Sequence, residues 1–111
     1  GGFSKVPLFS VTNINKAISH FKDNDFWITS FENDIEAKDW PSARKRLNAL
    51  ASVVPNDAML PLQQGLVLNM LGKRTKARAE LLRFIDSTQA EDPRRELAAR
   101  VYLSLTNEPK P

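Results

Sequence analysis

Apolar residues recur three and four positions apart along almost the whole chain after residue 12, and no stretch alternates apolar with polar residues for long. This spacing is the period of an amphipathic α-helix and not of a half-buried strand. Because turns of three to five residues interrupt it, we expect an all-α array of antiparallel helix hairpins. The pattern predicts six helices, near residues 13–22, 27–36, 40–54, 58–71, 75–87 and 93–105.

Residues with special backbone preferences mark several of these helix ends. Asp39 is placed to cap the third helix, and Pro41 lies in its first turn, where a missing N–H costs nothing. Gly72 is well placed to end the fourth helix in the left-handed conformation. Trp40, between two helices, is expected to be a core residue that covers both helix ends. The alternative is that Trp40 is an exposed anchor for a partner.

Composition narrows the chemistry that such an array can carry. The chain has 111 residues, of which 41% are hydrophobic and 26% charged, as is typical of one globular domain. It has no cysteine and a single histidine, His20, which excludes disulfide scaffolds, cysteine nucleophiles and multi-histidine metal sites. The longest nearly apolar stretch, Leu66–Leu71, is far too short to span a bilayer. We therefore expect no enzyme activity, cofactor or metal.

The two ends differ in character from the rest of the chain. Residues 1–12 begin Gly-Gly-Phe without a methionine, so we interpret them as an N-terminal extension or a remnant of cloning. Residues 106–111 are polar and contain two prolines, which is typical of a linker or tail. The sequence thus predicts one helical domain over residues 13–105.

An internal repeat relates two of the expected hairpins. Ala43 and Ala77 each lie early in the second helix of their hairpin, and we call their separation in the sequence the repeat offset. Two pairs of large apolar residues keep the same offset, Leu47 with Leu81 and Leu50 with Phe84. Each hairpin thus has a small residue where two helices must approach closely, followed by large residues one and two turns later. Since such a unit cannot bury its apolar face alone, neighbouring units are expected to stack.

This pattern resembles the tetratricopeptide repeat (TPR) over residues 24–105, because the repeat offset equals the period of that family, about 34 residues. Further marks of the family are an early aromatic, a small residue in mid-helix, a glycine at the hairpin turn, a closing proline and a late aromatic, here Trp27, Gly65, Gly72, Pro55 and Tyr102. The chain departs from the family pattern at four positions, Phe31, Asp34, Pro61 and Gln89. The resemblance implies about two and a half repeats, with the helices at 13–22 and 93–105 as caps.

The resemblance also implies a binding groove, because the first helices of TPR hairpins line a concave surface that holds an extended peptide or a partner helix. The residues that it places there are Ile28, Glu32, Ile35, Met59, Leu62, Leu66, Asn69 and Arg100, with Glu96 and Leu103 beside them. An apolar groove suits an amphipathic helix or a hydrophobic peptide, and a methionine adds adaptable packing. The alternative is that these residues are core, covered by residues 3–9.

Charge is distributed unevenly and leaves a second function open. Residues 1–40 carry a balance of −2 and residues 41–111 a balance of +5, which together give the net charge of +3. Basic residues at 44–46, 73–78 and 94–100 account for most of the excess, and such a face attracts nucleic acid. No recognition motif accompanies them, and solvated helix surfaces often look the same. A basic nucleic-acid-binding domain is therefore the alternative function.

These observations favour a non-catalytic adaptor or scaffold domain that binds a hydrophobic peptide, a partner helix or a neighbouring domain. We expect it to belong to a larger assembly or secretion-related protein, in a setting such as the bacterial cell envelope. Periplasmic, cell-envelope and cytoplasmic locations are all compatible with the residues, as is a homo-oligomer. We expect no small-molecule substrate.

Overall fold

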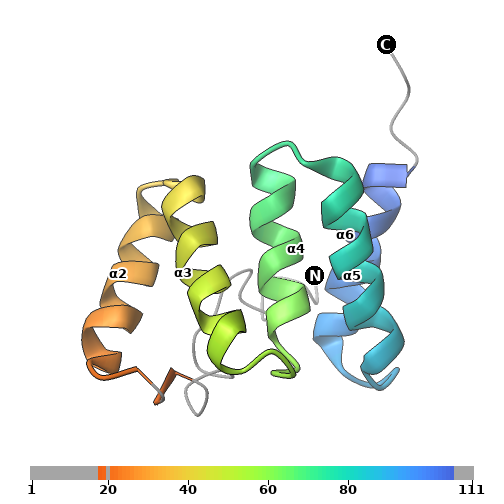
Figure 1. The fold of residues 1–111 in the computed structure, drawn as a ribbon. Coiled ribbons are helices and arrows are strands. Elements are labelled where there is room, and N and C mark those ends of the chain that lie inside the picture. Colours follow the sequence, from red (N-terminus) through yellow and green to blue (C-terminus); the bar gives the residue numbers. More distant parts are fainter. Residues whose placement is uncertain (1–17, 20, 107–111) are drawn as a thin grey trace.

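The computed structural model describes residues 18–19 and 21–106, and this part of the chain contains five α-helices and no strand (Figure 1). The all-α prediction is confirmed. The expected helix at 13–22 falls mostly outside the described residues, and the extension at 1–12, His20 and residues 107–111 fall wholly outside them. The helices are α2 (Asn24–Glu36), α3 (Trp40–Val53), α4 (Leu60–Met70), α5 (Arg74–Ser87) and α6 (Pro93–Thr106).

Short polar side chains fix where three of these helices begin. Asp23 accepts a hydrogen bond from the backbone N–H of Phe26 at 3.0 Å and so caps α2. Asp39 caps α3 in the predicted way, because its carboxylate accepts from both the backbone N–H and the hydroxyl of Ser42. Asp92 accepts from the backbone N–H of Arg94 at the start of α6. Each contact satisfies an N–H that has no partner within its own helix.

The helices run up and down in alternation, and each packs mainly against its neighbours in the sequence (Figure 1). The contacts pair α2 with α3, α3 with α4, α4 with α5, and α5 with α6, and the α4–α5 contact is the most extensive. This chain-order packing is the expected array of antiparallel hairpins.

One apolar core runs through the array, and α4 lies at its centre. Nearly every residue of α4 from Leu60 to Leu68 is buried. Its Gly65 permits a close helix contact, since a Cβ at this position would lie 2.7 Å from Cγ and Cδ2 of Leu81 in α5. The other buried apolar residues in the described part of the chain are Ile18, Trp27, Phe31, Ala43, Leu47, Leu50, Met59, Ala77, Leu81, Phe84, Ala98 and Leu105.

The turns α2–α3 and α4–α5 have the same backbone conformation, one repeat offset apart. Ala37 and Leu71 are right-handed, with φ and ψ of −78° and −5° in one and −82° and −3° in the other. The next residues, Lys38 and Gly72, are left-handed, with φ of 59° and 77°. The residues that follow repeat as well, with φ and ψ of −87° and 74° at Asp39 and −90° and 73° at Lys73.

The hydrogen bonds and helix lengths keep the same repeat offset. The N–H of Asp39 donates to the carbonyl of Asp34 at 2.8 Å, and the N–H of Lys73 donates to that of Leu68 at 2.9 Å. The helices that follow, α3 and α5, each have 14 residues and begin one repeat offset apart. Ala43 and Ala77 are both fully buried. The periodicity of the sequence is therefore a periodicity of the backbone.

Two features distinguish the first hairpin from the second. Asp34 forms an ion pair with Nε of Arg46 at 2.6 Å and so ties α2 to α3 through charge, where the second hairpin has the buried Leu68. Trp40 is half-buried and packs against the core, as expected of a core residue and not of a fully exposed anchor. It lies at the start of α3, next to a solvent-exposed turn.

Candidate interaction surfaces

The residues of the predicted groove differ widely in their exposure. On α2, Ile28 and Ile35 are half-buried against the core and Glu32 is exposed. On α6, Arg100 is exposed. Asn69, near the end of α4, is half-buried. The remaining three are buried, with exposed fractions of 6%, 2% and 2%, namely Met59, Leu62 and Leu66.

The buried members belong to the core and offer little surface to a partner. The guanidinium of Arg94 in α6 lies over Met59, with Nη1 3.5 Å from its sulfur. Because the helices pack in chain order, α2, α4 and α6 do not form one closely packed set. The predicted groove therefore stays a prediction. Its exposed or half-buried members are Ile28, Glu32, Ile35, Asn69 and Arg100.

Several of the basic residues that give the second half its charge are used inside the fold. Arg74 and Arg78, early in α5, donate to the carbonyl of Leu105 at the end of α6, at 2.8 and 3.5 Å. In return, Arg95 of α6 donates to the carbonyl of Ile85 near the end of α5 at 3.0 Å. Each helix thus places positive charge at the negative, carbonyl-bearing end of the other.

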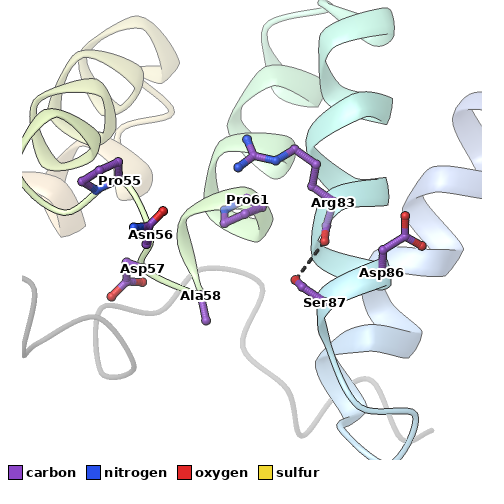
Figure 2. A pocket seen from close by; sticks show the side chains of 8 residues that line it. All are labelled: Pro55, Asn56, Asp57, Ala58, Pro61, Arg83, Asp86 and Ser87. Atoms are coloured by element: carbon purple, nitrogen blue, oxygen red, sulfur yellow. Dashed lines mark hydrogen bonds between the residues drawn. The ribbon is translucent and has the colours of Figure 1, made fainter.

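Among the described residues, a cleft opens between the α3–α4 loop and the second half of α5 (Figure 2). Its volume is about 430 Å³, and a smaller hollow of about 80 Å³ lies beside it, because the two share three lining residues. We call them together the α3–α5 cleft. The larger part is lined by Pro55, Asn56, Asp57, Ala58, Pro61, Arg83, Asp86 and Ser87, and the smaller part adds Ala51, Leu60, Gln64 and Glu80.

Most polar groups of the cleft already have partners. The hydroxyl of Ser87 donates to the carbonyl of Arg83 at 2.9 Å (Figure 2). Arg83 pairs with Glu80 at 2.9 Å, although its side chain stays 65% exposed. One carboxylate oxygen of Asp57 accepts from the N–H of Met59 and so shapes the loop.

Gln64 is buried and only partly satisfied. Its side chain is only 8% exposed, and its Nε2 donates to Oδ1 of Asn48 in α3 at 2.9 Å. Its Oε1 is buried and has no hydrogen-bond partner among the residues that the structure describes. Leaving a buried acceptor unsatisfied costs about 1–3 kcal/mol. A polar side chain that lines the smaller hollow is therefore held in place at a cost in stability.

The sequence did not predict this cleft. Pro55 and Asp57 indicate a turn, and nothing in their order shows that the second half of α5 lies opposite them. One signal was present, because Gln63 and Gln64 interrupt the most apolar helix of the chain. Buried polar residues in such a place are rare enough to merit attention.

Neither metal-site chemistry nor a membrane span is evident in the described part of the chain. It holds no cluster of three or more His, Asp or Glu side chains able to bind a metal ion, and no helix long and apolar enough to cross a membrane. The pKa of Asp92 is lowered, chiefly because Arg94 donates a hydrogen bond to its carboxylate. That pair lies at the start of α6, where Arg94 also contacts Met59 of the predicted groove.

Comparisons of the chain with family models, with curated proteins and with solved structures give no match. The fold therefore defines the class of this protein. It is an all-α array of helix hairpins, in which the backbone conformation recurs after one repeat offset.

Proposed function

We propose that this domain is a non-catalytic adaptor of the TPR type, which binds a hydrophobic peptide, a partner helix or a neighbouring domain. The observation that carries the proposal is the repeated turn, in which Ala37-Lys38-Asp39 and Leu71-Gly72-Lys73 share backbone angles and hydrogen bonds. The TPR family repeats a helix–turn–helix unit with a period of about 34 residues. The interval between these two turns equals that period.

Open arrays of stacked hairpins expose extended surfaces that suit the binding of other chains. The exposed and half-buried members of the predicted groove provide apolar and charged groups on three helices. Glu32 on α2 and Arg100 on α6 are exposed and of opposite sign, so that charge can orient a bound segment.

The nucleic-acid alternative receives less support. Arg74, Arg78 and Arg95 bond to helix ends, and Arg46 and Arg94 pair with carboxylates, so these guanidinium groups serve the fold first. Binding to phosphates would compete with these contacts.

A peptide selection tests the proposal. The purified domain is screened against two displayed libraries, one of random extended dodecamers and one of amphipathic helices, and the affinities of the selected peptides are measured by calorimetry. We expect binders whose affinity falls when both charges are reversed in the variant Glu32→Lys/Arg100→Glu. The matched control, Lys45→Glu, changes an exposed charge on α3 and should leave affinity unchanged.

Thermal unfolding must first show that both variants are folded. If neither library yields a peptide that binds this domain more tightly than it binds an unrelated helical protein, the adaptor proposal is wrong. If peptides are selected but bind both variants equally, the predicted groove is wrong and the adaptor proposal stands.

A further inference from the structure

We propose that the α3–α5 cleft is a second binding site, which takes a short extended segment of a partner protein that carries a lysine or arginine. The site shares no residue with the predicted groove. The inference rests on the proposed function, because it assumes a domain that binds segments of other chains, and it adds the place and the chemical class of one such segment.

Gln64 is the first reason for this inference. The equivalent positions in the neighbouring hairpins, one repeat offset before and after it, are Ser30 and Ala98. Ala98 is fully buried, so the array can be packed at this position by a small apolar residue. Packing therefore does not require the amide, whose Oε1 lacks a partner among the described residues. This oxygen has almost no accessible surface, so a backbone N–H of a bound segment, which is a donor of the kind it needs, reaches it only when the Gln64 side chain turns toward the cleft.

The charge of the lining is the second reason. Asp57, Glu80 and Asp86 face only one basic residue, Arg83, so the cleft carries a formal balance of −2 in a chain whose net charge is +3. Arg83 is already paired with Glu80. In Figure 2, Asp57 lies on the loop and Asp86 lies on α5, with the Asp86 side chain pointing away from the loop. Charges on a rim steer and orient a partner of opposite sign, which here is a basic side chain.

The shape of the cleft is the third reason. Its volume of about 430 Å³ lies in the range of ligand-binding clefts, roughly 300–1,000 Å³, and holds only a few residues. Helices shorter than about 12 residues are marginal in water, so a segment short enough to fill this space is extended and not helical. Pro55 and Pro61 form walls that have few conformations to lose on binding.

The experiment titrates the isotope-labelled protein with two capped hexapeptides, followed by amide chemical shifts. One peptide alternates lysine with alanine and proline, and the other has glutamate in place of each lysine. We expect the lysine peptide to shift the signals of Asn56, Gln64, Arg83 and Ser87 and to bind at least about fivefold more tightly than the glutamate peptide, as one ion pair of about 1 kcal/mol would give.

Three variants test these reasons separately. Gln64→Leu removes the acceptor and should weaken the lysine peptide severalfold without lowering the thermal midpoint. The double variant Asp57→Asn/Asp86→Asn removes two charges but keeps a side-chain oxygen at position 57 that accepts from the N–H of Met59. It should therefore abolish the preference for the lysine peptide over the glutamate peptide. Asp25→Asn, an exposed acid on α2, is the control and should change nothing. If Gln64→Leu does not fold, the charge variant still decides.

Three outcomes would overturn this inference. They are an absence of cleft shifts at millimolar lysine peptide, equal binding of both peptides, and shifts confined to groove residues such as Ile28 and Arg100. The last leaves the adaptor proposal intact, as does the selection of groove-binding peptides from the libraries. Failure of the two libraries removes the adaptor proposal, whatever the hexapeptides show.

Discussion

Gly65 sets how closely α4 and α5 approach each other. A methyl group at this position would lie 2.7 Å from two side-chain atoms of Leu81 and 3.3 Å from its backbone nitrogen. Leu81 is fully buried, so it has little room to move away. The absence of a side chain at Gly65 is thus a requirement of the hairpin contact and not of backbone conformation.

We expect Gly65→Ala to destabilise the domain despite the better helix propensity of alanine. Overpacking lowers the free energy of unfolding by about 1–3 kcal/mol, and the better helix propensity of alanine raises it by about 1 kcal/mol. The net loss is therefore about 1 kcal/mol. Urea unfolding measures this loss. In a Leu81→Ala background the clash with the Leu81 side chain is absent, so Gly65→Ala should be much less destabilising. Additive effects of the two changes would contradict the assigned contact.

Asp92 and Arg94 form a pair whose contribution depends on pH. Arg94 lowers the pKa of the Asp92 carboxyl, mainly through its side-chain hydrogen bond, while burial acts in the opposite direction. A carboxyl whose pKa is lowered by folding adds stability above its unfolded pKa, near 3.8, and loses that contribution as pH falls through its folded value.

Asp92→Asn should therefore lower the free energy of unfolding by about 1 kcal/mol at neutral pH and by much less at about pH 2. The amide keeps an acceptor for the backbone N–H of Arg94, so the change isolates the charge. Urea titrations at both pH values provide the measurement. An equal loss at both would assign the effect to capping and not to the ion pair.

Among the structural elements, the two hairpin turns use the same backbone with different residues. Lys38 adopts a φ of 59°, where Gly72 in the second turn adopts 77°. A side chain in this region costs about 1–2 kcal/mol, and glycine avoids that cost but loses more entropy on folding. The same structural requirement is therefore met at unequal cost in the two hairpins.

We expect Lys38→Gly to raise stability by about 0.5–1 kcal/mol and Gly72→Ala to lower it by about 1 kcal/mol. A Cβ at Gly72 would meet no atom within 4 Å, so the loss would come from the backbone alone. Thermal midpoints give both signs, with Lys38→Ala as a control that should be nearly neutral. A stabilising Gly72→Ala would show that the turn is not held in the left-handed conformation.

Across the molecule as a whole, antiparallel packing brings the basic residues of one helix to the carbonyl end of the next. Arg74 and Arg78 bond to the end of α6, and Arg95 bonds to the end of α5. The positive balance of residues 41–111 is therefore partly a structural device that ties α5 and α6 together, and less of it is available to an external polyanion.

Binding to random DNA should accordingly be no tighter than about 10⁻⁶ M near physiological salt, the range of non-specific attraction. Gel-shift titration with duplexes of several sequences measures it, with poly-glutamate as a competitor to detect a general charge effect. Submicromolar, sequence-selective binding would overturn the adaptor proposal in favour of the nucleic-acid alternative.

Local structure and the repeat could be predicted from the order of the residues. Apolar spacing, the Asp39 cap and the left-handed position of Gly72 are properties of a few neighbouring residues, so helices α2 to α6 and their turns could be predicted without a fold. The matching positions of Ala43 and Ala77 predicted two buried small residues, because only small residues permit close helix crossings. These features depend on contacts within one hairpin.

Which side chains are buried, and which surfaces remain, depends on how the hairpins stack. Met59, Leu62 and Leu66 have the same spacing in a groove as in a core, and only the packing of neighbouring elements shows that they are buried. The α3–α5 cleft joins a loop to a helix much further along the chain, as its lining residues Pro55 and Arg83 show. The spacing of neighbouring residues does not predict that this loop and this helix lie side by side, because their proximity depends on how one hairpin stacks on the next.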